Sequence, residues 1–189
     1  KKLKSETWMN EVDLFVKSLA FYILSFLMIG VSWMVKPTLF RNISYFLLII
    51  GFLIHGYGIL LRMQIMGRPP VSTLYESVIF VSFIILLLAV TLEYFRADGL
   101  GIFVGSVGGS ILHFVGFSYS ADGDTLGMLV AVLDSNFWLA THVTTITIGY
   151  GASLAAGFIG HLYLIYNILN PLNNKKLKSI FNNLFGMTL

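Results

Sequence analysis

The segment Leu74–Phe95, LYESVIFVSFIILLLAVTLEYF, is long and apolar enough to cross a lipid bilayer as one helix. Runs of this kind recur along the chain, in which 57% of the residues are hydrophobic and only 11% are charged. A soluble domain carries about 25% charged residues, so this chain cannot cover a surface that faces water. The sequence therefore predicts an all-α, polytopic transmembrane helix bundle.

Five spans are expected, within a single transmembrane domain that covers residues 1–189 and belongs to a longer protein. They are predicted at residues 14–35, 43–63, 74–95, 100–117 and 137–169. The apolar stretch 125–133 is too short to span and is predicted to form a short interfacial helix. Asp134, Ser135 or Asn136 is expected to cap the last span, because each can accept a hydrogen bond from a free backbone N–H group.

The charged residues between the spans predict the orientation in the membrane. A basic cluster follows the last span and favours the cytoplasmic side, whereas the acidic loop before that span favours the outer side. The basic cluster is Lys175, Lys176 and Lys178, and the acidic loop holds Asp122, Asp124 and Asp134. Since successive spans alternate in direction, the turn between the second and third spans is also expected on the outer side. The amino terminus is then expected outside as well, although its three lysines favour the opposite side.

Several classes of site are excluded. The chain has no cysteine, which rules out a disulfide, a thiolate metal site and a cysteine nucleophile. Its glycine-rich stretches lie inside spans, so they are not phosphate-binding loops. No nucleophile elbow and no H-E-x-x-H motif occur. We therefore expect no catalytic residue.

The four histidines carry most of the chemical information, because ionisable residues inside a membrane are costly and usually functional. His142 is predicted near the outer end of the fifth span, with His113 and His55 also in the outer half of the membrane. His161 lies about 28 Å further along the same helix axis and is expected at the cytoplasmic interface. The imidazoles of His55, His113 and His142 could therefore meet, whereas that of His161 could not join them. Alternatively, His55 and His113 form interhelical hydrogen bonds, and His142 is a hydrogen-bonded interface residue.

Small and hydroxyl-bearing residues continue the face of His142 at helical spacing, at Thr145, Gly149 and Ser153, with Gly157 further down. Such a face allows another helix or a flat ligand to approach closely. Ordinary helix packing explains it equally well. A second series, for which plain packing is the better explanation, occupies the fourth span at Gly101, Gly105 and Gly109.

Polar residues also concentrate in the turn between the second and third spans, at Arg62, Arg68, Pro69, Pro70, Ser72, Tyr75 and Glu76. Arg62 and Glu76 could pair across this turn. Alternatively, Arg62 or Arg68 could hold an anionic group such as a carboxylate through paired hydrogen bonds. A third reading is that the turn simply anchors a hairpin at the interface.

Two motifs together resemble those of the CcsA/ResC-type cytochrome c biogenesis proteins. The run GRPPVSTLYES at 67–77 is similar to the family's G-x-x-P-x-S-N-x-Y-E-S pattern, with Thr73 where Asn is usual. The run LDSNFWLATHV at 133–143, followed by Ile148-Gly149-Tyr150, is similar to its W-L-x-x-H-V…Y pattern. The run HGYGILLR at 55–62 also fits, so the resemblance covers about 43–166, the amino-terminal portion of such a protein.

The resemblance implies a haem-handling protein of the bacterial inner membrane, with its functional face in the periplasm. Such proteins transport b-type haem, in transit, and present it for covalent attachment to apocytochrome c as part of a holocytochrome c synthase (haem lyase) system. His142 matches the axial ligand of the haem iron, and we expect His55, Arg62 and Trp138 to contribute to haem binding. A tryptophan-rich outer segment and a second outer histidine are expected beyond Leu189. A ResB/CcsB-type partner, fused or separate, is also implied.

Two other functions remain open. The chain could be a proton- or solute-conducting transporter subunit that uses His55 and His113 as an intramembrane relay. It could also be a structural membrane subunit whose histidines only join helices.

Overall fold

A computed structural model describes residues 13–35, 37–67, 69–120 and 136–169. This part of the chain contains helices and turns and no strand. Its helices are α2 (Leu14–Met34), α3 (Pro37–Met66), α4 (Leu74–Arg96), α5 (Leu100–Ser120) and α6 (Asn136–Leu169). Each of the five is long and apolar enough to cross a membrane, so the expected polytopic helical bundle is confirmed.

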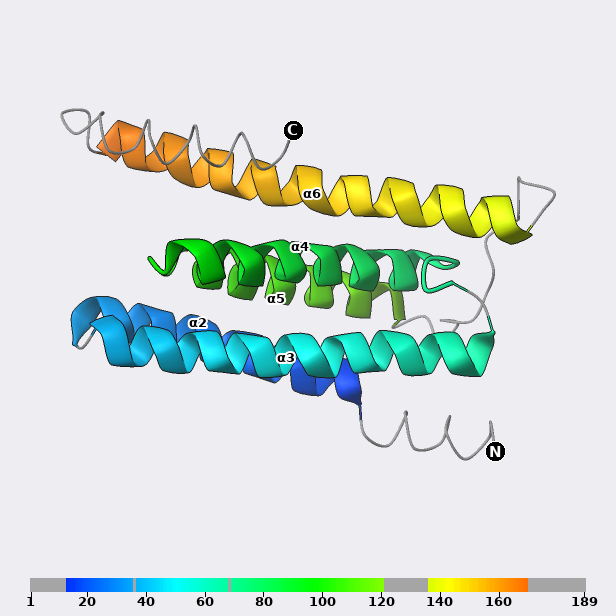
Figure 1. The fold of residues 1–189 in the computed structure, drawn as a ribbon, viewed down its shortest axis with the longest axis horizontal. Helices are drawn as coiled ribbons and strands as arrows, with labels where there is room; N and C mark the ends of the chain where they lie inside the picture. The colour runs from blue at the N-terminus through cyan, green and yellow to red at the C-terminus, as the bar shows by residue number, and fades with distance from the viewer. Residues whose placement is uncertain (1–12, 36, 68, 121–135, 170–189) are drawn as a thin grey trace.

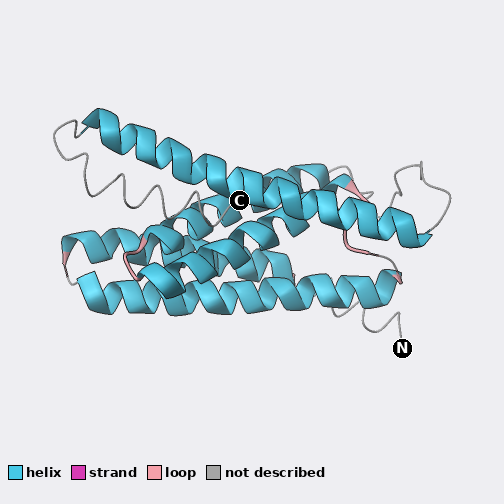
Figure 2. Cartoon of the chain, turned by 45° about the horizontal axis from the view of Figure 1, so that its top comes forward, coloured by secondary structure: helices cyan, strands magenta, loops and turns pink. Residues whose placement is uncertain are grey.

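The helices form three layers (Figure 1). The antiparallel pair α2 and α3 makes one layer, the pair α4 and α5 makes the next, and α6 lies on the far side of α4. Helix α2 packs on α5 and thereby joins the first two layers. Helix α6 is peripheral, because only 11% of its most apolar stretch of 18 residues is buried, compared with 33–50% of the same stretch in each of the other four helices. Figure 2 shows it running along one side of the remaining bundle.

The helix ends differ from the predicted spans mainly in α3, which begins at Pro37 instead of about residue 43. Proline suits the first turn of a helix because the backbone N–H that it lacks has no partner there. The predicted interfacial helix at 125–133, the proposed cap residues Asp134 and Ser135, and Arg68 lie outside the described residues.

Helices α4 and α5 approach so closely that glycine is required between them. A Cβ atom on Gly101 would lie 2.4 Å from the carbonyl oxygen of Ala89, and one on Gly105 would lie 2.8 Å from the Ala89 Cβ. A Cβ on Gly109 would lie 3.2 Å from the Leu86 side chain. The small-residue series in α5 therefore serves helix packing, as the sequence indicated.

The turn between α4 and α5 is held by Glu93, a carboxylate that is almost fully buried. Its oxygens accept hydrogen bonds from the backbone N–H groups of Gly99, at 3.0 Å, and Gly101, at 3.2 Å. These N–H groups belong to the start of α5 and have no partner within that helix, so the carboxylate satisfies them. The carboxylate also lies at the positive end of the α5 dipole. Arg41 of α3 donates to the carbonyl of Ala97 and attaches the first layer to the same turn.

Candidate functional site

His142 lies in the second turn of α6, and its side chain is exposed. Trp138, one helical turn earlier, is 64% exposed. The buried residues of α6 lie on the other side of the helix, where Gly151 and Ala155 pack toward α4. His142 therefore faces away from the bundle.

The small-residue face beneath His142 is exposed throughout, at Thr145, Gly149, Ser153 and Gly157. A Cβ atom added at Gly149 or Gly157 would meet no atom within 4 Å. The predicted face is therefore real, and no described helix packs on it. In this structure it is open to a flat ligand or to a further helix.

His55 and His113 are in the opposite situation, because both are fully buried between helices. Their ring centroids are 4.7 Å apart, and the ring planes are nearly perpendicular. The Tyr22 hydroxyl lies 3.1 Å from Nδ1 of His55 and donates to the carbonyl of Gly51 at 3.0 Å. We refer to His55 and His113 as the histidine pair.

His113 has hydrogen-bond partners in its own helix and in two others. Its Nδ1 lies 2.8 Å from the Gly109 carbonyl oxygen within α5 and 3.3 Å from Oγ of Ser82 on α4. Its Nε2 lies 3.2 Å from Oγ of Ser18 on α2. The interhelical hydrogen bonds expected for both buried histidines are thus present.

The structure brings two of the four imidazoles together and separates the others. The histidine pair meets inside the bundle, but His142 points outward from α6. His161 is also exposed on α6, with Nδ1 2.7 Å from the Gly157 carbonyl oxygen. Among the described residues, no group of three or more His, Cys, Asp or Glu side chains could hold a metal ion. A haem iron is a different case, because the porphyrin supplies most of its ligands and one imidazole can hold it axially.

His55 does not fit a haem ligand in this packing. Its Nε2 is buried. The ring is enclosed by Phe15 and Phe83, with centroids at 5.7 and 5.6 Å, and by Tyr22 and His113. A macrocycle could reach Nε2 only if these rings moved apart.

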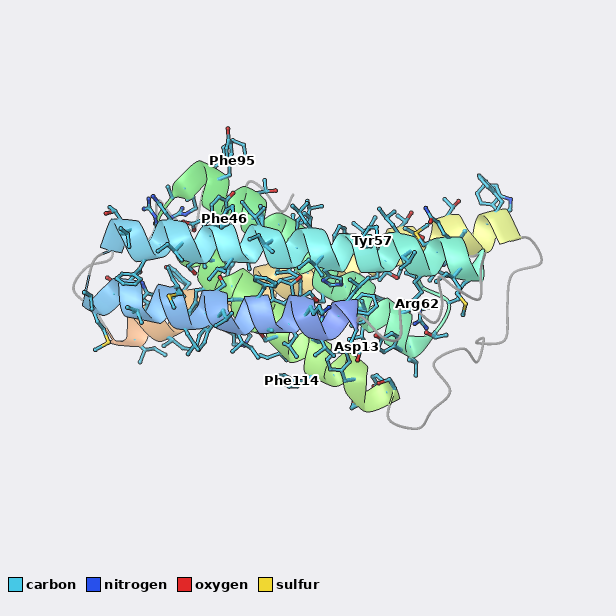
Figure 3. The ribbon with its side chains drawn as sticks, turned by 90° about the horizontal axis from the view of Figure 1, so that it is seen from below. Asp13, Phe46, Tyr57, Arg62, Phe95 and Phe114 are labelled. Carbon is cyan, nitrogen blue, oxygen red and sulfur yellow. The ribbon has the colours of Figure 1, made fainter. Side chains whose placement is uncertain are left out.

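Arg62 and Glu76 form the ion pair that the sequence suggested, with 2.9 Å between Nε and Oε1. Their side chains are only 9% and 2% exposed, and the guanidinium carbon lies 5.0 Å from the centre of the Tyr75 ring. Figure 3 shows Arg62 toward the same end of the bundle as Asp13, the residue before α2. Because the Arg62 guanidinium is engaged with Glu76, its first role here is to join α3 to α4.

Glu76 has a second role that our reading of the sequence missed. Thr73 is the N-cap of α4, and its hydroxyl accepts from the Glu76 N–H at 3.0 Å. The Glu76 carboxylate in turn accepts from the Ser72 N–H at 3.1 Å. The sequence signal was available, because Thr-x-x-Glu before an apolar run is the capping-box pattern; here the carboxylate bonds the N–H of Ser72, one residue before the N-cap. Thr and Asn both cap well, so Thr73 in place of the family's Asn keeps this function.

Comparison with curated proteins finds relatives at moderate identity, and no family model matches the chain. Protein NrfI of Wolinella succinogenes is 32% identical over 175 residues, which is 89% of this chain and 19% of that protein. The cytochrome c biogenesis protein CcsA of Chlorella vulgaris is 33% identical over 58% of this chain and 38% of its own length. CcsA of Chlamydomonas reinhardtii is 27% identical over 87% of this chain and 45% of its length. The chain thus spans less than half the length of each of these relatives.

Proposed function

The chain is a relative of the CcsA-type cytochrome c biogenesis proteins, as its motifs predicted, and from that kinship we propose that it handles haem during cytochrome c assembly. In this proposal it transports b-type haem, in transit, and presents it at the outer face of a membrane for covalent attachment to apocytochrome c. The residue that carries the proposal is His142, as the axial ligand of the haem iron.

The observation that supports this role is the outward direction of His142 beside an exposed series of small and hydroxyl-bearing residues, with the Ile146 side chain also on this side of α6. A porphyrin is flat, and exposed positions such as Gly149 and Ser153 let it lie close to the helix backbone. Trp138 is four residues before His142, so it lies on the same side of α6 and offers an aromatic surface to the porphyrin.

Bound haem would supply an iron that accepts a neutral imidazole, an apolar macrocycle and two anionic propionates. The contribution of this chain is to hold and orient that group. The imidazole of His142 would hold the iron, and the small-residue face would leave room for the macrocycle beside α6. In this packing the Arg62 guanidinium pairs with Glu76 and joins α3 to α4.

The remaining parts of the proposal concern the whole protein. We place it in a bacterial inner membrane, with His142 on the periplasmic side. The acidic loop that precedes α6 in the sequence supports this orientation, because loops without basic residues favour the outer side. A ResB/CcsB-type partner would complete the assembly, and catalysis of attachment would belong to that complex. The five described helices, each long and apolar enough to cross a membrane, support this location.

The test uses the full-length native protein, purified in detergent, with copurified haem measured by its absorbance. His142→Ala is expected to lose most of the haem, because the axial bond is removed. His161→Ala is the matched control, since it removes an exposed imidazole from the same helix, and it is expected to keep the wild-type level. Adding imidazole to His142→Gly is expected to restore part of the haem. Full haem occupancy in His142→Ala would refute the ligand assignment.

The histidine pair favours a second candidate function, conduction of protons or a small solute. Two imidazoles and the hydroxyls of Ser18, Tyr22 and Ser82 lie within hydrogen-bonding distance in the bundle interior. Liposomes that contain the protein would then show a pH-dependent flux that His55→Gln abolishes. Haem handling by His142 predicts no such flux.

A further inference from the structure

The histidine pair is covered on one side by Phe15, which belongs to the first turn of α2. The centre of the Phe15 ring lies 5.7 Å from that of His55 and 6.5 Å from that of His113. A third aromatic neighbour is Tyr75 of α4, whose ring centre lies 6.2 Å away. Phe15 is itself buried, with 8% of its surface exposed. One side chain of α2 therefore contacts both the histidine pair and Tyr75.

Tyr75 places this cover at the end of the bundle where α2 begins. The Arg62 guanidinium carbon lies 5.0 Å from the centre of the Tyr75 ring. Figure 3 shows Arg62 toward the same end as Asp13, which directly precedes α2. A line of side chains thus runs inward from the ion-paired Arg62 through Tyr75 and Phe15 to the histidine pair. Phe15 is the last side chain of this line before the two imidazoles.

Gly58 of α3 leaves the space that the first turn of α2 occupies. A Cβ atom on Gly58 would lie 3.1 Å from an edge carbon of the Phe15 ring and 3.5 Å from Cβ of Leu14. The turn therefore packs directly against the α3 backbone. Contacts of this kind are van der Waals contacts, which are lost as soon as the turn moves away.

The first turn of α2 is weakly held at its start. Asp13, the N-cap residue, has a left-handed backbone with φ 42°, and its side chain makes no capping hydrogen bond. A left-handed conformation is unfavourable for a residue with a side chain, and the N–H groups of a first turn have no partner within the helix. The start of α4, in contrast, is capped by Thr73. An uncapped helix end can open locally while the rest of the fold stays intact.

We propose that the first turn of α2 is a gate, which covers the histidine pair when Leu14 and Phe15 pack against Gly58 and uncovers it when the turn unwinds. Ser18 sets the limit of the moving part. Its hydroxyl donates to the Phe15 carbonyl at 2.8 Å and also lies 3.2 Å from Nε2 of His113. Unwinding as far as Phe15 breaks the first contact and keeps the second, so the gate opens without separating whole helices.

The site behind the gate suits a small, uncharged molecule. Its described hydrogen-bonding groups are uncharged, namely the hydroxyls of Ser18, Tyr22 and Ser82 and backbone groups of Ile79 and Gly109. An ion would give up its hydration here without an opposite charge in return, which is costly. We therefore expect the gate to admit water or another small neutral molecule.

A disulfide lock tests the gate, because residues 1–189 contain no cysteine. The double variant Leu14→Cys/Gly58→Cys places two Cβ atoms 3.5 Å apart, which is within the range of a disulfide. The full-length protein in detergent, with any cysteine outside residues 1–189 replaced by serine, is treated with diethyl pyrocarbonate. This small neutral reagent modifies imidazoles, and mass spectrometry then measures the reaction of each histidine.

With the lock reduced, His55 and His113 are expected to react slowly, through the open state of the gate. With the lock oxidised, both rates are expected to fall at least tenfold and to recover on reduction. His161, which is exposed on α6, is expected to react at one rate in both states. Equal rates at the buried histidines in the two states would overturn the proposal, and so would the absence of any reaction there in the reduced protein.

Phe15→Ala removes the cover without a cross-link and is expected to raise the reaction rate of His55 and His113 at least tenfold over the wild type. Phe114→Ala is the matched control, because it removes a ring that is 58% exposed on α5, and it is expected to leave the rates unchanged. Wild-type rates in Phe15→Ala would also contradict the gate. Neither experiment involves haem, so the outcome is independent of the proposed function.

Discussion

Nε of Arg62 lies 2.9 Å from Oε1 of Glu76, and this contact ties the end of α3 to the first turn of α4. The same carboxylate accepts from the backbone N–H of Ser72. One buried glutamate thus stabilises a helix start and neutralises a buried arginine. The local turn and the packing of two helices consequently depend on each other.

Replacing Glu76 with Gln is expected to destabilise the bundle by about 3–5 kcal/mol, because it leaves the buried Arg62 guanidinium without its counter-charge. Unfolding by SDS in mixed micelles measures this loss. The double variant Arg62→Met/Glu76→Gln is expected to lose less, since no unpaired charge remains. Equal losses in the single and double variants would show that the ion pair is not responsible.

Thr73→Ala is expected to destabilise the protein by about 1 kcal/mol, because the first turn of α4 loses its cap. Thr73→Asn supplies another side-chain oxygen and is expected to remain close to the wild type. Both values can be obtained from the same SDS unfolding measurement. A Thr73→Asn loss as large as that of Thr73→Ala would argue against the capping role.

Gly101→Ala is expected to be strongly destabilising, because its new methyl group would meet the backbone oxygen of Ala89 at 2.4 Å. Backbone atoms cannot rotate away, so α4 and α5 would have to separate. Gly157→Ala is the matched control, since nothing lies within 4 Å of its added Cβ. It is expected to be neutral or to stabilise α6 by up to about 1 kcal/mol. Thermal melts that rank the two variants in the opposite order would contradict this packing.

Tyr22→Phe tests the hydroxyl that bridges α2 and α3. Without it, Nδ1 of His55 loses its hydrogen-bond partner, and a buried polar atom left without a partner costs about 1–3 kcal/mol. Tyr94→Phe removes an exposed hydroxyl from α4 and is expected to have no measurable effect. Identical melting temperatures for the two variants would mean that the Tyr22 hydrogen bonds contribute little.

Much of the fold could be read from composition and short motifs. Apolar runs of the length of Leu74–Phe95 have few alternatives to transmembrane helices, because only a helix satisfies its own backbone groups within lipid. The pairing of Arg62 with Glu76 could also be predicted from the sequence, since a short turn places the residues at its two ends close together. The capping box at Thr73 was equally readable but was overlooked.

The meeting of the histidines could not be read in this way. Sequence position gives the height of His55, His113 and His142 along their helices, because each residue adds about 1.5 Å to the axis. It does not give the rotation of each helix or the choice of its neighbours. Height alone therefore allowed three imidazoles to meet, whereas the structure joins two.

Local features follow from residue order: the five membrane helices, the small-residue series in α5, and the kinship carried by two motifs. That His55 and His113 share one buried site while His142 faces outward from α6 is a property of the packed bundle. Helix formation depends on hydrogen bonds within a short segment. The direction of a side chain, in contrast, depends on how segments distant in the chain pack against each other.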